Sequence, residues 1–162
     1  MAKIKPRLPF YSWDSTAMIA WLSDEKGAPL GNIDVVVAEI DLKLANLLLA
    51  VTVITEILES KHTPEQMDRF NKFLKNPNVI TGDTTAPIAM RASRIRSDGA
   101  ATGRSLKTPD ATIMATSIIY RVDALHTLEP KLINLTGMPL VDGLRISLPI
   151  AFHGQGGLDF QS

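Results

Sequence analysis

The 162-residue chain contains no cysteine, which excludes a disulfide scaffold, a zinc site built from thiolates and a thiol nucleophile. It also lacks a long hydrophobic run. The longest apolar stretch, residues 44–54, contains Asn46 and Thr52 and is too short to span a bilayer. No apolar core of signal-peptide length precedes Asp14. We therefore expect a soluble, cytoplasmic protein that does not bind membranes.

The chain has no excess of either charge, because 17 basic residues balance 17 acidic ones. This balance argues against a protein held on nucleic acid or membrane by bulk positive charge, although it allows a local basic patch. The sequence has no phosphate-binding P-loop, no Rossmann glycine fingerprint, and no G-x-S-x-G elbow around Ser15. Its histidines, at positions 62, 126 and 153, have no metal-ligand spacing. These absences exclude the commonest nucleotide-binding and serine-hydrolase sites.

What is present is the composition of an ordinary globular domain, with 45% hydrophobic and 21% charged residues. The length predicts a single domain over residues 1–162. Periodicity predicts strands at residues 8–13, 47–53, 79–81 and 124–127, and helices at 15–24, 33–44, 64–75, about 86–96 and 108–122, with a further helix starting at Thr52 or Thr55. The Gly- and Ala-rich stretch 97–107 is predicted to be a loop. Strands separated by helices indicate an α/β domain with a mostly parallel sheet.

Four acidic residues fall at comparable places in this pattern. Asp14 directly follows the first strand, Glu56 lies just beyond the second, and Glu129 follows the strand that ends near Thr127. Asp110 stands at a helix start that could face the same edge. Ligands of an open parallel sheet gather outside the carboxyl ends of its strands. The pattern therefore predicts a shared acidic pocket.

Carboxylates in one pocket repel, and each raises the pKa of the others, unless a hard divalent cation binds between them. A bound Mg²⁺ or Mn²⁺ could activate a water molecule for phosphodiester cleavage, without cysteine or histidine. Each acid also has a structural interpretation. Asp14 could be a helix cap, Asp110 could stabilise a helix dipole, Glu56 could be a solvated helix residue, and Glu129 could belong to a surface turn. Only a common location would favour the metal site.

Four segments carry a resemblance to a known family. They are residues 10–22 (FYSWDSTAMIAWL), 49–58 (LAVTVITEIL), 108–117 (TPDATIMATS) and 125–129 (LHTLE). In this order they resemble the PIN-domain ribonucleases, the family that includes VapC-type toxins. The resemblance covers about residues 8–135. Residues 138–162 form a C-terminal extension outside the pattern.

The resemblance implies a three-layer α/β/α fold and an endoribonuclease that depends on Mg²⁺ or Mn²⁺. It implies that Asp14, Glu56 and Asp110 are metal-site acids and that Glu129 completes the catalytic set, where the family usually has Asp. Asp123 is a nearby substitute. The resemblance also implies an RNA substrate, an antitoxin as a partner, and a homodimer. The alternative is a non-catalytic PIN-like module that binds RNA or protein.

A group of basic residues could position RNA phosphates, which proteins bind without reading base sequence. The group comprises Arg91, Arg94, Arg96, Arg104 and Lys107, and its alternative interpretation is a solvated helix face and loop. An aspartyl-phosphate phosphatase would also place an acid after the first strand. Such an enzyme needs a second Asp two residues after Asp14, and that position is Thr16. The sequence thus favours the nuclease.

Overall fold

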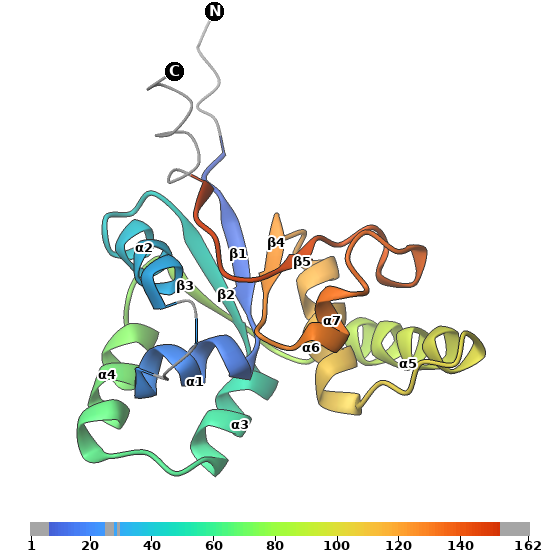
Figure 1. The fold of residues 1–162 in the computed structure, drawn as a ribbon, viewed down its shortest axis with the longest axis horizontal. Helices are drawn as coiled ribbons and strands as arrows, with labels where there is room; N and C mark the ends of the chain where they lie inside the picture. Colours follow the sequence, from blue (N-terminus) through green and yellow to red (C-terminus); the bar gives the residue numbers. More distant parts are fainter. Residues whose placement is uncertain (1–6, 25–27, 29, 153–162) are drawn as a thin grey trace, which may run out of the picture.

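The computed structural model describes residues 7–24, 28 and 30–152, so the predictions for His153 and the Gly-rich end of the chain lie outside the described residues. Its centre is a parallel sheet with the strand order β3-β2-β1-β4-β5 (Figure 1). The strands are β1 (Phe10–Trp13), β2 (Asn46–Ala50), β3 (Val79–Gly82), β4 (Ala124–His126) and β5 (Ile146–Ser147). The predicted parallel α/β fold class is confirmed.

Helices cover both faces of this sheet. They are α1 (Ser15–Ser23), α2 (Leu30–Asp41), α3 (Val51–Glu59), α4 (Pro64–Leu74), α5 (Ala86–Ala101), α6 (Thr108–Ile119) and the short α7 (Pro130–Ile133), with a 3₁₀ turn η1 (Pro139–Val141). In Figure 1, α1, α2 and α4 lie on one side of the sheet and α5 and α6 on the other. The result is a three-layer α/β/α arrangement.

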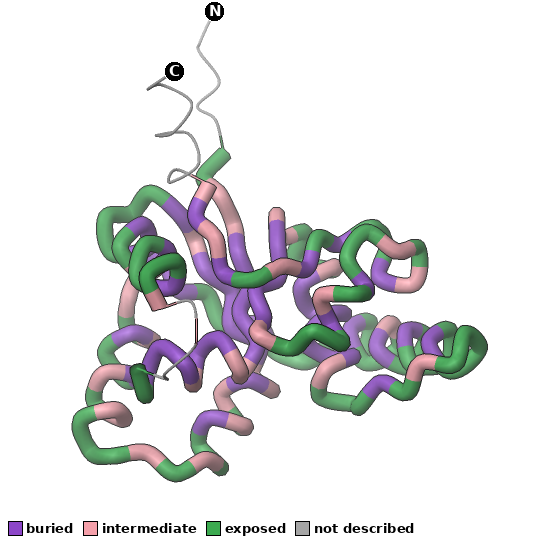
Figure 2. Tube along the Cα trace, in the orientation of Figure 1, coloured by how far each residue is buried: buried purple, intermediate pink, exposed green. Residues whose placement is uncertain are grey.

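Side chains of β1 show how one short strand serves both layers. Trp13 stacks on Phe73 of α4 with ring centroids 6.2 Å apart, whereas Ser12 shares a hydrogen bond of 2.7 Å with Ser117 of α6. Successive strand residues point to opposite faces, so a strand covered on both sides is buried throughout. Figure 2 shows this burial along the central strands. Leu47, for example, is fully buried.

The helix starts that contain Thr-Pro are confirmed, with one adjustment. Thr63 forms a capping box at α4, because its hydroxyl accepts from the Gln66 N–H and its own N–H donates to the Gln66 side chain. At α6 the N-cap is Lys107, and Thr108 is the first helical residue. Pro109 therefore still occupies the first turn, where its missing N–H costs nothing.

Several predicted boundaries are wrong. The helix predicted at residues 33–44 is α2, which runs from Leu30 to Asp41. The apolar run 47–53 does not form one strand, because β2 ends at Ala50 and α3 begins at Val51 with no loop. A short apolar run cannot tell a buried strand from a buried helix start. The predicted loop 97–107 is helical up to Ala101. Alanine favours this extension, and Gly99 is needed there for packing, because a Cβ would lie 3.0 Å from Leu106 Cδ1.

The chain beyond the family resemblance belongs to the same fold as far as residue 152. β5 pairs with β4 at one edge of the sheet, and the Phe152 N–H donates to the Tyr11 hydroxyl at 2.8 Å. Val141 and Ala151 are buried in the core. Among the described residues, no helix is both long enough and apolar enough to cross a membrane.

Candidate active site

The site begins where β1 and β4 end side by side. Trp13 pairs with His126 in the sheet, and the Asp14 N–H donates to the His126 carbonyl at 3.1 Å. This register places Asp14 beside Thr127 although the two residues are far apart in sequence. The starts of α1 and α3 face the same edge of the sheet, and α6 begins close by (Figure 1).

Asp14 is almost completely buried, with 2% of its surface exposed. It is the N-cap of α1, accepting the Ala17 N–H at 3.1 Å, so its interpretation as a helix cap is correct. Two hydroxyls also donate to its carboxylate: Thr16 to Oδ1 at 2.6 Å and Thr127 to Oδ2. Burial raises the pKa of Asp14, these hydrogen bonds lower it, and the charge of Asp110 raises it. The carboxylate thus has more partners than a helix cap requires.

The two threonine hydroxyls are oriented by backbone donors. Thr16 Oγ1 accepts from the Leu128 N–H at 2.9 Å, and Thr127 Oγ1 accepts from the Glu129 N–H at 3.0 Å. A hydroxyl that accepts from the backbone is free to donate its own proton to Asp14. Both threonines lie within the motifs of the family resemblance, but no role was predicted for them. Their position next to predicted acids was the available signal.

Glu56 approaches the neighbourhood of Asp14 from α3. Its Oε2 accepts a hydrogen bond of 3.0 Å from Ser15 Oγ, which directly follows Asp14. Its Oε1 is buried and has no hydrogen-bond partner within the described part of the chain. Burial raises the pKa of Glu56, the bond from Ser15 lowers it, and the charges of Asp110 and Asp14 raise it. Glu56 is therefore not the solvated helix residue of the alternative interpretation.

Asp110 approaches from the first turn of α6 and is half-buried. Burial is the main cause that raises its pKa. Lys107 and Lys131 lower this pKa, and Glu129 raises it. The α6 start has no side-chain cap hydrogen bond, so Asp110 does not cap the helix, and its place in the first turn also suits the helix dipole. The charges of one acid and two lysines thus act on its carboxylate.

The remaining acids separate clearly. Glu129 is exposed at the N-cap of α7, close enough to Asp110 for their charges to interact. Asp123 lies at the opposite end of the sheet, where it accepts from the Phe10 N–H at 2.8 Å and pairs with Arg7 at 2.5 Å. Asp123 therefore holds the start of β1 and is not a substitute for Glu129.

Asp14, Glu56 and Asp110 lie at the same edge of the sheet but do not form a complete set of metal ligands. Across residues 7–24, 28 and 30–152, no three Asp, Glu or His side chains are arranged as a ready-made metal-binding group. Mg²⁺ commonly binds through one or two carboxylates and keeps several waters, so it does not need such a cage. The unpartnered Oε1 of Glu56 and the mutual repulsion of the acids fit a hydrated hard cation.

The structure divides the predicted basic group. Arg91 faces the η1 segment, where its guanidinium lies 3.9 Å from the Asp142 carboxylate, and Arg94 is exposed. Arg96 points to another side of α5, donating to the Leu106 carbonyl at 3.0 Å. Arg104 and Lys107 follow on the segment that leads to Asp110. Lys131 of α7 joins them by donating to the Ser105 carbonyl, a contact that sequence analysis missed.

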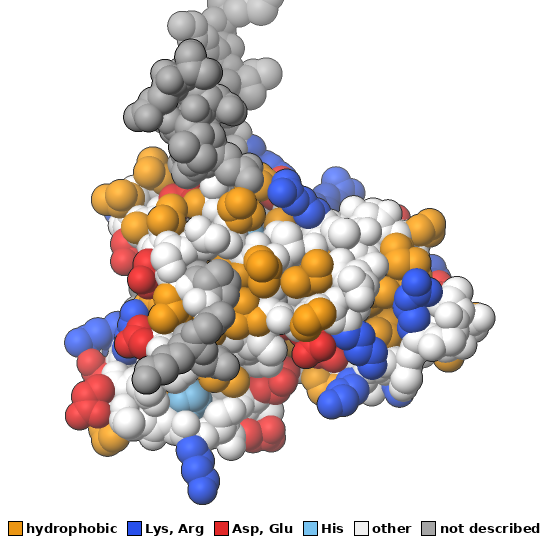
Figure 3. Space-filling model, in the orientation of Figure 1, with side chains coloured by type: hydrophobic (Ala, Val, Ile, Leu, Met, Phe, Trp, Pro, Cys, Tyr) orange, Lys and Arg blue, Asp and Glu red, His pale blue; other side chains and the backbone are white. Residues whose placement is uncertain are grey.

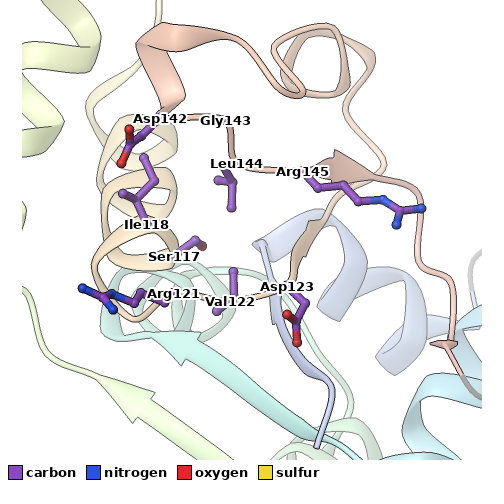
Figure 4. Close-up of a pocket in the computed structure, with 9 residues that line it drawn as sticks. All are labelled: Ser117, Ile118, Arg121, Val122, Asp123, Asp142, Gly143, Leu144 and Arg145. Carbon is purple, nitrogen blue, oxygen red and sulfur yellow. The ribbon is translucent and has the colours of Figure 1, made fainter. Parts of the chain in front are cut away.

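A separate hollow of about 290 Å³ lies beside the C-terminal end of α6. Its lining includes Asp123, Asp142 and Leu144, and the side chains of Arg121 and Arg145 point away from its centre (Figure 4). Ligand sites usually have polar groups that converge on the ligand. This hollow lacks that arrangement and lies away from Asp14.

Comparison with known proteins gives a match by structure alone. No family model and no curated protein matches the sequence. A chain of VapBC2 from Rickettsia felis, bound to a promoter DNA fragment, superposes with a TM-score of 0.62 at 14% identity, covering 85% of this chain and 96% of that one. A chain of DNA-bound VapBC from Salmonella typhimurium superposes with a TM-score of 0.60 at 18% sequence identity, covering 86% of this chain and 97% of that one. A chain of a toxin–antitoxin complex from Klebsiella pneumoniae superposes with a TM-score of 0.60 at 19% sequence identity, covering 88% of this chain and 99% of that one.

Structural matches at such low sequence identity establish the fold and nothing beyond it. They confirm the predicted resemblance to VapC-type PIN domains at the level of chain architecture. Activity, substrate and site residues depend on the geometry described above.

Proposed function

We propose that this chain is a metal-dependent endoribonuclease that hydrolyses RNA phosphodiester bonds. One observation carries the proposal: Asp14, Glu56 and Asp110 come from three separate helices and lie close enough for the charge of Asp110 to raise the pKa of the other two, while burial is the main cause that raises all three pKa values. Burying carboxylates together is unfavourable unless they serve a cation or a proton-transfer role. The fold shared with VapBC proteins is consistent with this activity.

In the proposed mechanism, Asp14, Glu56 and Asp110 would hold the metal, directly or through water. A bound Mg²⁺ or Mn²⁺ would supply a water of lowered pKa and stabilise negative charge on the departing oxygen. Thr16 and Thr127 hold the Asp14 carboxylate in a fixed orientation and favour its ionised form against the burial that raises its pKa. Glu129, at the exposed rim, orients the attacking water.

We extend the proposal to the biological setting. The similar structures include a toxin–antitoxin complex and DNA-bound VapBC, so we propose that this chain is the toxin of such a pair. An antitoxin protein would then be its partner, RNA its substrate, and a homodimer its assembly. Co-purification of a co-expressed antitoxin, followed by light scattering of the free chain, measures both assemblies.

The test uses the purified protein with Mn²⁺ and labelled single-stranded RNA. Asp14→Asn and Asp110→Asn should each reduce cleavage by about a hundredfold or more, since even outer-shell partners of a metal are worth ~10–100-fold. Asparagine is as good an N-cap as aspartate, so Asp14→Asn should still fold. Asp34→Asn, at an exposed acid on α2, is the matched control and should cleave like wild type.

Two results would count against the proposal. Unchanged cleavage in both site variants would remove the assigned residues from the reaction. Folded wild type that cleaves none of a varied RNA set with Mg²⁺ or Mn²⁺ would favour the non-catalytic PIN-like binding module instead.

A further inference from the structure

We infer that the surface between the α5–α6 connection and α7 is a nucleotide subsite. It would take the unpaired base of a single-stranded RNA in a hollow, and the neighbouring phosphates on four cations. We call these cations the basic rim: Arg96, Arg104, Lys107 and Lys131. The inference rests on the proposed function and deepens it by assigning the side on which RNA lies.

The hollow has about 410 Å³ and opens beside Asp110's helix. Its walls are the 103–106 segment and α7, which Lys131 links by donating to the Ser105 carbonyl. Leu106 and Leu135 are largely buried and give it an apolar floor. Ligand pockets typically have ~300–1,000 Å³, an apolar lining and few polar groups. The hollow has the size for one planar base, with two leucines beneath it and polar side chains around its edge.

The side chain of Asn134 is available for hydrogen bonding at this hollow. Asn134, the C-cap of α7, lines it and is exposed, and within the described residues its amide makes no hydrogen bond to another protein group. An amide offers both donors and an acceptor, which suits the edge of a base. Bases in an RNA duplex are stacked and paired, so only an unpaired nucleotide could enter.

The basic rim carries positive charge that no carboxylate neutralises by a salt bridge within the described part of the chain. Arg96 donates to the Leu106 carbonyl at 3.0 Å and Arg104 to the Thr102 hydroxyl at 3.0 Å, both neutral acceptors. A second hollow of about 250 Å³, lined by Arg96 and Arg104, lies on the other side of segment 104–106. Figure 3 shows Lys and Arg side chains over this part of the surface.

The rim also adjoins the acids. Lys107 and Lys131 lie close enough to Asp110 for their charges to lower its pKa. An RNA strand with one phosphate at Asp110 would therefore place its next phosphates near these two lysines, and the phosphates beyond those near Arg104 and Arg96. Because the protein has no net charge, this local excess is the means by which a polyanion would be held.

The test is anisotropy of a labelled single-stranded RNA of mixed sequence, bound to the full chain in EDTA so that no cleavage occurs. Arg104→Gln and Lys131→Gln should each weaken binding. Each should also reduce the slope of log affinity against log salt by about 0.7, the value for one phosphate contact on a single strand. Asn134→Ala should weaken binding without changing the salt slope.

The matched control is Lys75→Gln, which removes an equal charge from the exposed C-terminal end of α4 and should bind like wild type. A duplex of the same sequence should bind more weakly than the single strand. Equal affinities and salt slopes for wild type, Arg104→Gln and Lys131→Gln would overturn the subsite, as would wild type that binds no RNA.

Because EDTA removes the metal, this result is independent of cleavage. Rim variants that bind poorly, with no cleavage by wild type in Mn²⁺, would keep the subsite and reject the nuclease. Rim variants that bind RNA normally, with cleavage lost in Asp14→Asn, would reject the subsite and keep the nuclease.

Discussion

At the scale of single residues, the notable feature is a buried carboxylate that keeps three protein donors. Asp14 receives hydrogen bonds from Ala17, Thr16 and Thr127 while its burial disfavours the charged form. The donors and the burial act on its pKa in opposite directions. Removing a donor should therefore change the pH at which Asp14 ionises.

Thr127→Val tests this opposition. The variant loses the hydroxyl that stabilises ionised Asp14, so the pKa of Asp14 rises, and a higher pH is needed to ionise it. The acid limb of the cleavage rate should move to higher pH, and Mn²⁺ affinity should fall by roughly 10–100-fold. Thr55→Val is the control, since that exposed hydroxyl donates only to the Val51 carbonyl. An unmoved acid limb would mean that Thr127 does not tune the site.

Asp110→Asn tests the mutual repulsion of the acids. Folding raises the pKa of Asp110 above its ordinary value, so the ionised residue destabilises the metal-free fold as the pH rises through that range. At pH 8 the metal-free variant should melt at the same temperature as wild type or higher. The difference should shrink in acid, where Asp110 is protonated in both states. A large loss of melting temperature would instead assign Asp110 a structural role at the start of α6.

The sequence was sufficient to predict which acids lie at the ends of strands and the starts of helices, but not which residues contact the site from elsewhere in the chain. Asp14 and Glu56 could be located because each follows a recognisable strand, and Asp110 because it follows a proline at a helix start. Thr127 and Lys131 could not, because their roles depend on which distant carboxylate or carbonyl the fold brings to them.

At the scale of elements, the predicted helices and strands are present and most errors are at their ends. The prediction ended α5 too early because Gly99 suggested a loop. In the fold, Gly99 allows the 104–106 segment to cross close to the helix, since a Cβ there would lie 3.1 Å from the Arg104 carbonyl oxygen. That contact depends on tertiary packing, which local propensity does not report.

Gly99→Ala should therefore be destabilising although alanine is the better helix former. The helix would gain up to ~1 kcal/mol from propensity, but overpacking against the Arg104 carbonyl and Leu106 costs about 1–3 kcal/mol. We expect a net loss of about 1 kcal/mol in the free energy of unfolding measured in urea. Gly31→Ala on α2, where no atom of the described residues lies within 4 Å of the added Cβ, is the control and should be neutral or stabilising. Equal behaviour of both variants would contradict the close approach.

At the scale of the whole molecule, the fold joins β1 to β4 through a buried side-chain pair behind the site. Trp13 Nε1 donates to His126 Nδ1 at 3.1 Å, and burial, followed by the charge of Arg145, lowers the pKa of His126 to about 3. His126 is thus neutral in the folded protein. Its ring is fully buried and stacks on Tyr11 with centroids 4.8 Å apart, so His126 has a packing role.

This buried histidine predicts an acid-sensitive fold. Between about pH 6.5 and 3 the unfolded chain binds a proton at His126 that the folded chain does not, so stability falls as the pH falls, by up to ~1.4 kcal/mol per pH unit from this group. His126→Asn keeps a hydrogen-bond acceptor for Trp13 and should lose this contribution. Urea unfolding of both proteins from pH 7 to 4 isolates it, because the site acids contribute equally to each. Parallel pH profiles would show that His126 is not buried neutral.

The central claim is that Asp14, Glu56 and Asp110 form one cation site, and the most direct measurement is anomalous diffraction from crystals soaked in Mn²⁺. The account predicts a manganese peak in the pocket between these residues, with carboxylate oxygens of Asp14 and Asp110 about 2.1 Å from the ion and waters completing its shell. A saturated soak with no peak there, or with manganese bound only at other acids, would contradict it.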